Sequence, residues 1–356
     1  GAGGPFNINS APRLREVLFD RLELPVIKKT PKGAPSTDAA VLAKLVDEHP
    51  VVAKLLQYRE LEKLRSTYVD GLLPLVEPDG RIRAVFNQTG AATGRLSSER
   101  PNLQNIPIRR EEGKAIRRAF VAEPGATFIV ADYSQIELRI LAHLSRDPGL
   151  LEAFANDDDI HRATAARVFG VGLDAVTPEM RRRAKAINFG LLYGMEAYGL
   201  AQRLEIERAE AEEQISAYFD QFPSVRAFMN GVVADARAAG YTTTILGRRR
   251  YLPELASANY RDRQMGERMA LNAPIQGSAA DIIKKAMVTL DGEFEARADG
   301  TAMLLQIHDE LVIETPEGAA DTVIAVTRRV MEDVVELAVP LRVDIATGPD
   351  LASCKA

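Results

Sequence analysis

The stretch TFIVADYSQIELRILAHLS, residues 127–145, contains the change of pattern from which we infer the fold. An unbroken apolar run, FIVA, is typical of a buried strand, and Asp132 follows it directly. After this acid the apolar residues Ile136, Ile140 and Leu144 recur at helical spacing. Asp132 is therefore predicted at a joint between a strand and a helix, where its carboxylate could hold a cation. A simple helix cap is the alternative.

A second acidic position lies in residues 301–315, TAMLLQIHDELVIET. Two apolar runs flank only His308, Asp309 and Glu310, which predicts a tight hairpin with an acidic tip. A two-metal centre for phosphoryl chemistry needs at least two carboxylates to offset the charge of its ions. Asp132 and Asp309 are candidates for this pair, and acids on a solvated turn are the alternative.

A third element, MRRRAKAINFGLLYG, predicts a helix with a functional face. Every fourth residue of this segment is cationic or aromatic, namely Arg181, Lys185, Phe189 and Tyr193. About twelve helical residues span roughly 18 Å, which is comparable with a nucleotide laid from its phosphates to its base. The cations can bind phosphates, and the aromatic rings can stack on the sugar and the base.

These three stretches resemble motifs A, B and C of family A DNA polymerases, the bacterial DNA polymerase I type. The matching wordings are DYSQIELR, R-x-x-x-K-x-x-x-F-x-x-x-YG and HDE; TGRLSS, PNLQNIP and NAPIQGSAADI match the same family. The similarity runs from about Phe6 to about Gly348. It implies an α+β fold with the right-hand polymerase architecture, in which an antiparallel-sheet palm carries mainly helical fingers and a helical thumb.

The resemblance also implies an order of subdomains. Residues 1–70 would form part of the thumb, 71–150 the first part of the palm, 151–266 the fingers and 267–356 the second part of the palm. The family places a long thumb helix and some palm strands before the residues with which this sequence starts. We therefore expect the first thumb helix to be absent, and we expect no exonuclease domain in this chain.

The activity implied by the resemblance is template-directed extension of a DNA primer with dNTPs, which releases pyrophosphate during replication or repair. Two Mg²⁺ ions, for which Mn²⁺ could substitute, would stand roughly 3.5 to 4 Å apart. Asp132, Asp309 and the backbone carbonyl of Tyr133 would bind them, and Glu310 would support the site. Lys185 would act with these catalytic acids by donating a proton to the pyrophosphate.

The resemblance assigns the remaining binding residues to two groups. The residues expected to bind the nucleotide are Gln135, Glu137, His161, Arg181, Lys185, Phe189 and Tyr193. The residues expected to contact the primer-template duplex are Lys63, Arg95, Asn102, Gln104, Asn105, Arg268, Asn272, Gln276 and His308. Glu137 and Tyr193 together would leave no room for a 2′-hydroxyl. For the duplex contacts, structural turns and polar outer helix faces are the alternatives.

Other stretches predict helices without chemistry. Residues 10–24 indicate a capped amphipathic helix, Thr37 and Asp38 can cap the next one, and residues 51–70 predict a longer helix. The apolar face of this longer helix would consist of Leu55, Leu56, Leu61, Leu64 and Tyr68. A further long helix is predicted over residues 267–290, which Pro274 would kink or interrupt.

The charge of the chain is distributed unevenly. A formal net charge of −5 and a pI near 5.6 are unusual for a protein that binds nucleic acid. Clustered basic residues can nevertheless line a cleft that binds phosphates. The clusters are Arg109 and Arg110, Arg117 and Arg118, Arg181 to Lys185, Arg248 to Arg250, and Arg261, Arg263 and Arg268.

The composition bounds the class of protein. With 356 residues we expect two or three subdomains, and we expect a monomer. The sequence contains no run of eighteen apolar residues and opens with no signal peptide, so we expect a cytoplasmic protein without a membrane partner. The single cysteine, Cys354, excludes an internal disulfide and is expected to be a surface thiol.

Three other functions fit part of the pattern. A two-metal nuclease also needs paired acids, but it has no need of the nucleotide-sized stripe from Arg181 to Tyr193. A single-subunit RNA polymerase shares the architecture and is disfavoured chiefly by Glu137. A non-catalytic DNA-binding module would not require both Asp132 and Asp309.

Overall fold

The computed structural model describes residues 4, 6–107 and 111–354, and the basic pair Arg109 and Arg110 lies outside them. The chain divides into two compact units, residues 1–83 and 84–356, which are described separately below. Among the described residues, none of the helices combines the length and the apolar character that crossing a bilayer requires.

The first unit is helical. Its elements are α1 (Ala11–Arg15), which continues as a π-helix (Glu16–Arg21), α2 (Ala39–Ala43), α3 (Pro50–Leu64), a π-helix (Arg65–Val69) and a 3₁₀ turn (Leu73–Leu75). The predicted cap of α2 is confirmed, because the Asp38 side chain accepts a hydrogen bond from the Val41 amide at 2.9 Å. Ser10, at the start of α1, makes no such side-chain bond, so the predicted cap of that helix is wrong.

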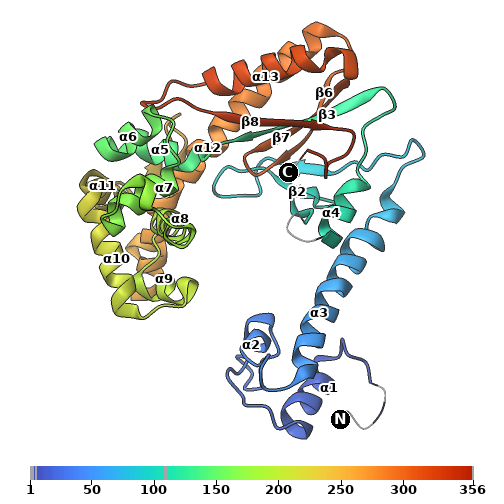
Figure 1. Ribbon diagram of the computed structural model, residues 1–356, viewed down its shortest axis with the longest axis vertical. Helices are drawn as coiled ribbons and strands as arrows, with labels where there is room; N and C mark the ends of the chain where they lie inside the picture. Colours follow the sequence, from blue (N-terminus) through green and yellow to red (C-terminus); the bar gives the residue numbers. More distant parts are fainter. Residues whose placement is uncertain (1–3, 5, 108–110, 355–356) are drawn as a thin grey trace. The chain divides into compact units, whose positions relative to one another are not determined.

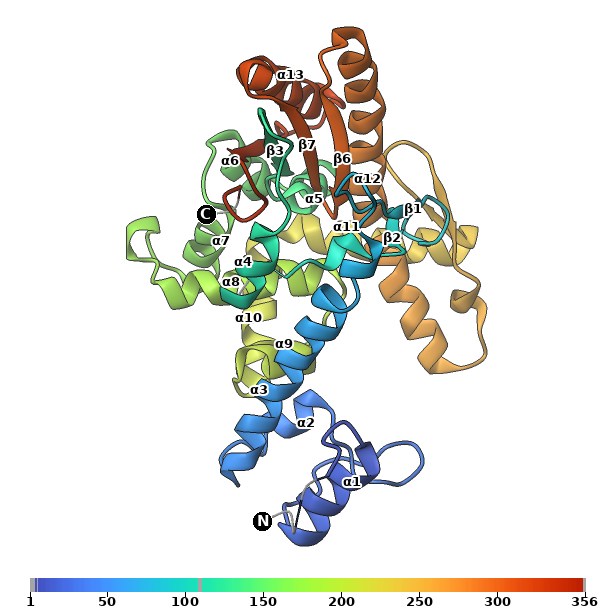
Figure 2. The same ribbon diagram turned by 90° about the vertical axis from the view of Figure 1, so that its right-hand side faces the viewer.

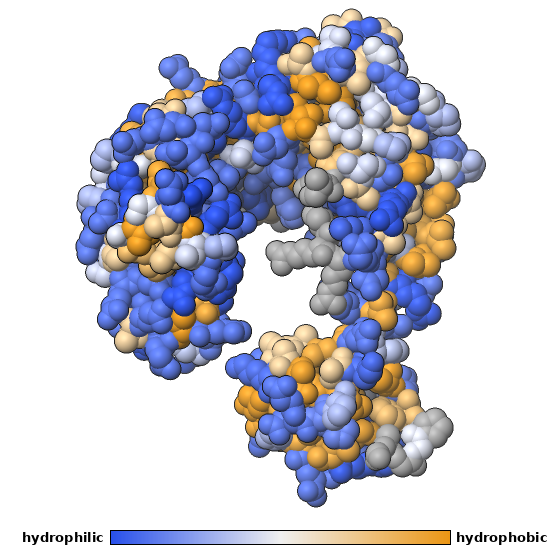
Figure 3. Space-filling view, viewed as in Figure 1, coloured by the Kyte–Doolittle hydropathy of each residue, from blue (hydrophilic) through white to orange (hydrophobic). Residues whose placement is uncertain are grey.

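The apolar core of this first unit is small. Leu14, Leu18, Leu42 and Leu55 are buried in it. The core reaches only the first half of α3, and Leu61 is 45% exposed, so the predicted continuous apolar face of this helix is wrong at that position. Figure 3 shows several apolar patches on the surface of this unit.

The second unit is built around a four-stranded antiparallel sheet with strand order β6-β7-β3-β8. The strands are β3 (Ala126–Tyr133), β6 (Ala302–Ile307), β7 (Glu310–Pro316) and β8 (Val343–Gly348). Helix α13 (Ala320–Asp333) packs against β3, β7 and β8, and its Val323 and Met331 share a core with Ile129 of β3. Figure 2 shows β3, β7 and β6 side by side next to this helix.

The strand and helix predicted over residues 127–145 are present, with one shift. β3 continues through Tyr133, so Asp132 lies within the strand, and α5 (Ile136–Ser145) begins three residues later. The predicted stripe of α5 is buried at Ile136 and Ile140, because it packs into the main core.

The helices between the two parts of the sheet gather in one region of Figure 1. They are α6 (Pro148–Ala155), α7 (Ile160–Phe169), α8 (Pro178–Leu192), α9 (Ala197–Leu204), α10 (Arg208–Gln221) and α11 (Pro223–Ala239). A short hairpin follows, β4 (Tyr241–Thr243) and β5 (Arg249–Tyr251), which the sequence did not predict. The long helix α12 (Tyr260–Arg297) is not interrupted at Pro274, and the hydroxyl of Ser278 donates a hydrogen bond to the Pro274 carbonyl.

The remaining elements are short. They are β1 (Val85–Asn87) paired with β2 (Ser97–Glu99), α4 (Glu111–Arg118), and 3₁₀ turns at Leu103–Asn105, Leu173–Ala175, Pro253–Ala256 and Glu317–Ala319. The prediction of a surface thiol is wrong, because Cys354 is buried and its Sγ lies 3.4 Å from the Asp350 carbonyl oxygen. This burial raises the pKa of Cys354 to about 11.

Candidate functional site

Asp132 and Glu310, which are far apart in the sequence, lie on adjacent strands. In the register of β3 and β7, Asp132 stands opposite Glu310. The Tyr133 amide donates a hydrogen bond to the Asp309 carbonyl at 3.1 Å, and His308 and Asp309 form the turn between β6 and β7. Directly opposed residues of an antiparallel pair have Cβ atoms about 4.5–5.5 Å apart. The sheet therefore places Asp132, Asp309 and Glu310 at the same end of its two central strands.

A chain of polar contacts runs from this acidic end to helix α8. The Arg95 Nη2 atom lies 3.6 Å from Asp309 Oδ1 and donates to Glu137 Oε1 at 2.7 Å. The Tyr193 hydroxyl, just beyond the last residue of α8, donates to Glu137 Oε2 at 2.5 Å. Glu137 is thus held from both sides at the start of α5, and the acids, the 93–95 loop and α8 meet around it.

The electrostatics of this cluster follow from its burial. Burial raises the pKa of Glu137; the Tyr193 hydrogen bond opposes this rise, the Asp309 charge adds to it, and Arg95 opposes it. Burial also raises the pKa of Asp309, whereas the charges of Arg95 and His308 lower it. Burial raises the pKa of Tyr193 further above its ordinary value, so this residue keeps its hydroxyl proton for Glu137.

The predicted stripe of α8 lies at the accessible side of the helix. Arg181 and Lys185 are exposed and Phe189 is half-buried, whereas Ala184, Ile187, Asn188 and Leu191 between them are buried. The helix begins where the Thr177 hydroxyl accepts a hydrogen bond from the Met180 amide at 3.2 Å. The cationic end and the aromatic end of the stripe are therefore both available to a ligand.

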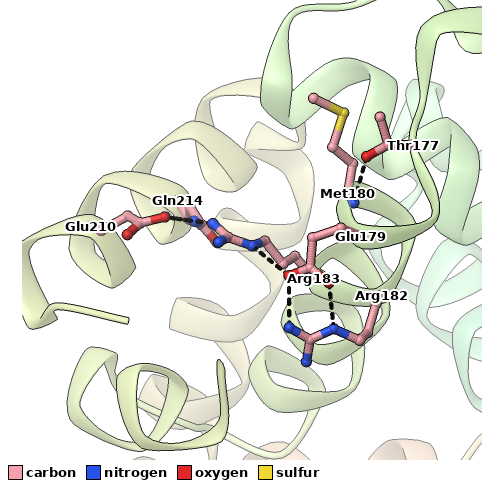
Figure 4. A network of polar contacts seen from close by, with 7 residues as sticks. All are labelled: Thr177, Glu179, Met180, Arg182, Arg183, Glu210 and Gln214. Atoms are coloured by element: carbon pink, nitrogen blue, oxygen red, sulfur yellow. Dashed lines mark hydrogen bonds and ion pairs between the residues drawn. The ribbon is translucent and has the colours of Figure 1, made fainter. Parts of the chain in front are cut away.

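Only part of the basic cluster Arg181 to Lys185 belongs to this stripe. Figure 4 shows Arg182 and Arg183 paired with Glu179 of the same helix, and Arg183 also with Glu210 of α10 at 2.5 Å. Arg183 therefore links α8 to α10, whereas Arg182 pairs within α8. Arg181 instead donates from Nε to Asp159 Oδ2 at 2.6 Å, just before α7.

His161 lies behind the stripe, in the first turn of α7. Its ring centroid is 5.6 Å from that of Phe189, and its Nδ1 is 3.1 Å from the Asn188 amide nitrogen. Burial lowers the pKa of His161 to about 4; Asp159 opposes this shift, whereas Lys185 and Arg181 add to it. The imidazole is consequently neutral near pH 7.

Comparisons with known proteins agree with this arrangement. A family model described as DNA polymerase family A matches residues 1–353. The chain belongs to DNA polymerase family A. It is 53% identical over 356 residues to the thermostable DNA polymerase I of Thermus aquaticus, with 99% of this chain and 42% of that protein covered. It is 52% identical over 350 residues to DNA polymerase I of Bacillus caldotenax, with 98% and 40% covered.

A solved structure is similar over almost the whole of this family A chain. It is described as the POL domain of Pol1 from M. smegmatis in complex with DNA primer-template and dNTP. The TM-score is 0.93 at 51% identity, with 99% of this chain and 62% of that chain covered. The polymerase-domain fold with its antiparallel sheet is thus confirmed. The chain spans about two fifths of the length of the curated relatives.

The acidic end of this family A chain offers donors that suit Mg²⁺. Asp132, Asp309 and Glu310 supply carboxylate oxygens, and Tyr133 supplies a backbone carbonyl. Among the described residues, no group of three or more His, Cys, Asp or Glu side chains is arranged so that it could hold a metal ion. Mg²⁺ commonly takes one or two protein carboxylates and completes its shell with substrate phosphates and water, so this donor set fits ions shared with a substrate.

The loop before the sheet is fixed to the hairpin tip. Gln104 Nε2 donates to the Gln306 carbonyl at 3.1 Å and to the Leu96 carbonyl at 3.3 Å. Asn102 accepts from the Gln104 amide at 3.0 Å, which is the structural turn that we weighed as the alternative. Asn105 and His308 are exposed. Asn102 therefore stabilises the turn, and Gln104 fixes the loop to β6.

The polar face of α12 reaches the same cluster. Arg268 is exposed, and a Cβ added to Gly194 would stand 3.2 Å from its Cγ, so this glycine lets the end of α8 approach α12 closely. Gln276 interacts with the Tyr193 hydroxyl. Asn272 lies between Arg268 and Gln276 at helical spacing and is half-buried. Lys63 is exposed on α3 of the other unit.

Sequence reasoning missed an ion pair that holds the loop of Arg95. Arg248, beside β5, donates from Nε to Asp281 of α12 at 2.8 Å and from Nη2 to the Thr93 and Gly277 carbonyls at 2.7 and 3.1 Å. A Cβ at Gly277 would stand 2.8 Å from Nη2, so only glycine permits this approach. The clustering of Arg248 with two further arginines was the available signal, but nothing in the pattern linked it to Asp281.

Two further residues near the stripe were also missed. Asp159, the partner of Arg181, ends an acidic run, Asp157 to Asp159, just before His161, so its position was a usable signal. Asn188 occupies a position one residue before Phe189, on the buried side of α8. No periodicity distinguishes such a residue from ordinary packing.

Proposed function

We propose that this chain extends a DNA primer along a template with dNTPs, by nucleotidyl transfer that releases pyrophosphate. The observation that carries the proposal is the continuous set of contacts from Tyr193 through Glu137 and Arg95 to Asp309, which joins the nucleotide-sized stripe of α8 to the paired acids. The names of the relatives and the ligands of the M. smegmatis structure support the same reaction.

We infer that Asp132 and Asp309 would hold two Mg²⁺ ions, with the Tyr133 carbonyl as a further ligand and Glu310 beside them. When bound, such ions activate the attacking hydroxyl and stabilise the leaving pyrophosphate. Metal ligation at Asp309 would free Arg95 from its contact at 3.6 Å, because a divalent ion neutralises the carboxylate more strongly than a shared guanidinium. Arg95 would then be available to the end of the primer.

The stripe of α8 would bind the triphosphate and the base. Arg181 and Lys185 would neutralise the phosphate charge, and Lys185 would donate a proton to the departing pyrophosphate. Phe189 would stack on the sugar or the base. Because Arg181 is paired with Asp159, its binding to a phosphate would exchange one anionic partner for another.

Selection of the sugar would depend on the pair of Glu137 and Tyr193. Their hydrogen bond of 2.5 Å places a carboxylate and an aromatic ring in contact beside the acids. We infer that this contact, with Gln135 at the start of α5, would close the space that a ribose 2′-hydroxyl needs.

We extend the proposal to the subdomains. Residues 1–70 would serve as part of a thumb, 71–150 and 267–356 as the palm, and 151–266 as the fingers. The helices α6 to α11 and the sheet support the last two assignments. We further infer that the chain works as a cytoplasmic monomer.

Primer extension tests the proposal directly. The purified chain is incubated with a labelled primer-template, dNTPs and Mg²⁺, beside the variants Asp132→Ala and Asp309→Ala. The matched control is Asp174→Ala, because Asp174 is a fully exposed acid away from the sheet. We expect extension by the chain and the control only, with duplex binding retained in all four proteins. Release of mononucleotides without dNTPs would instead indicate a nuclease.

A further inference from the structure

A buried polar network lies between α7 and α8, behind the stripe, and the proposed mechanism does not use it. Thr164 is 0% exposed, Asn188 1% and His161 3%. Buried polar groups normally satisfy their hydrogen bonds, and the direction of each bond is therefore fixed by what its partner can donate or accept. This network begins at a backbone carbonyl and ends at an imidazole.

The direction of the bonds can be followed from Ile160. Its carbonyl can only accept, and the Thr164 hydroxyl, 2.7 Å away, donates its single proton to it. The Thr164 oxygen lies 3.1 Å from the Asn188 amide nitrogen, from which it accepts, and 3.4 Å from Asn188 Oδ1. The amide is oriented with its nitrogen on the side of His161. The second proton of the same amide points to His161 Nδ1 at 3.1 Å.

From this chain of bonds we propose that Asn188 fixes the tautomer of His161, so that Nδ1 accepts, Nε2 carries the proton, and the Nε2 proton is offered to a phosphate oxygen of the bound nucleotide. Asn188 is a positioning residue in this scheme, and His161 is the group that touches the ligand. The part that concerns the nucleotide rests on the proposed function, whereas the part that concerns the tautomer does not.

The surroundings of the imidazole agree with an anionic ligand. Within the described part of the chain, no protein group accepts a hydrogen bond from Nε2. The charged groups around the ring are Asp159, which precedes α7, and Arg181 and Lys185 of α8. Since His161 is buried and neutral, only one of its nitrogens can donate, and the wrong tautomer would present a lone pair to the phosphate.

Nitrogen NMR of the whole chain, labelled at its four histidines, tests the tautomer without any substrate. The His161 signals are assigned by their loss in His161→Gln. We expect a protonated Nε2 and a bare Nδ1 near pH 7.5. In Asn188→Asp the carboxylate can only accept, so the proton should move to Nδ1 or the ring should become doubly protonated. Asn156→Asp adds the same charge at an exposed position nearby and should leave the pattern unchanged.

A wild-type ring protonated at Nδ1 would overturn the proposal, and so would a pattern that does not change in a folded Asn188→Asp. If this variant does not fold, the wild-type spectrum still decides the question. Absence of primer extension by the wild-type chain would refute the proposed function while leaving the NMR result valid.

Steady-state kinetics test the link to the nucleotide. In Asn188→Asp, Nε2 can donate only while the ring is doubly protonated, so the KM for dNTP should rise with pH, by about ten- to a hundred-fold between about pH 7 and 9. The wild-type chain and Asn156→Asp should show no such rise, and kcat should change less than KM. A flat KM in Asn188→Asp, with the tautomer changed, would show that Nε2 does not contact the phosphates.

Discussion

Replacement of Arg248 by alanine should loosen the loop that carries Arg95. The substitution leaves Asp281 buried, at 8% exposure, without its guanidinium partner. Such a loss costs about 3–5 kcal/mol when the pair is fully buried. The Arg248 side chain is 31% exposed, and Lys284 Nζ remains 3.5 Å from the same carboxylate, so we expect about 2–3 kcal/mol.

The partner variants should behave asymmetrically. Asp281→Asn keeps an oxygen that accepts from Arg248 and removes the buried charge, so it should cost about 1 kcal/mol or less. Arg248→Lys keeps the positive charge but cannot reach Asp281 and the carbonyls of Thr93 and Gly277 together, so it should cost about 1–2 kcal/mol. The order of destabilisation is therefore Arg248→Ala, Arg248→Lys, then Asp281→Asn.

Guanidinium denaturation of the whole chain measures these differences, and amide hydrogen exchange of residues 91–96 measures the loop itself. Exchange there should accelerate most in Arg248→Ala, whereas exchange in β3 should not. Arg250→Ala is the control, since the neighbouring arginine makes none of these bonds. A loss below about 0.5 kcal/mol in Arg248→Ala, or unchanged exchange in the loop, would refute the reasoning.

Four shorter predictions concern other residues of the second unit. Glu137→Ala should admit ribonucleotides in primer extension; unchanged discrimination would count against the proposed sugar selection. Phe189→Tyr should ease the use of dideoxynucleotides, because a tyrosine hydroxyl can replace the contact of the missing 3′-hydroxyl; equal termination by both proteins would contradict this. The depressed pKa of His161, about 4, means that the unfolded chain binds its proton more readily, so stability should fall as pH drops from about 6.5 toward 4, and His161→Gln should flatten that part of the curve. Because burial raises the pKa of Cys354 to about 11, a thiol reagent should modify it slowly in the native chain and rapidly in denaturant.

The sequence predicted the strands and the helix around the candidate site because their signals are local and strong. An apolar run that ends in Asp132, and two such runs around Asp309, are short patterns that a sheet converts directly into neighbouring strands. The position of the stripe residues on one face of α8 was equally predictable, since helical spacing alone decides which residues share a face. The residues that touch within 2.7 Å, Arg95 and Glu137, required the fold, because no pattern relates a loop to a helix 42 positions away.

Two of the failures have a common cause, which is that the burial of a side chain depends on the elements that pack against it. Leu61 follows the apolar spacing of α3, yet the small core of its unit ends before it. Cys354 lies close to the end of the chain but packs near Gly348 and Asp350, which no composition rule indicates. The β4–β5 hairpin has only three residues in each strand, too few for alternation to be recognised.

Arg181 and Arg95, two of the cationic residues assigned to the substrate, already pair with acids of the chain, and these ion pairs differ in strength. Arg181 and Asp159 have side chains 46% and 35% exposed, so their ion pair is worth only about 0–1 kcal/mol and a phosphate can displace Asp159 at little cost. Arg95 instead pairs with the buried Glu137, which also accepts a hydrogen bond from Tyr193. Displacing Arg95 would leave the buried Glu137 carboxylate without its cationic partner, which is costly. A ligand should therefore capture Arg181 readily, whereas Arg95 should keep Glu137 and exchange only its looser contact with Asp309.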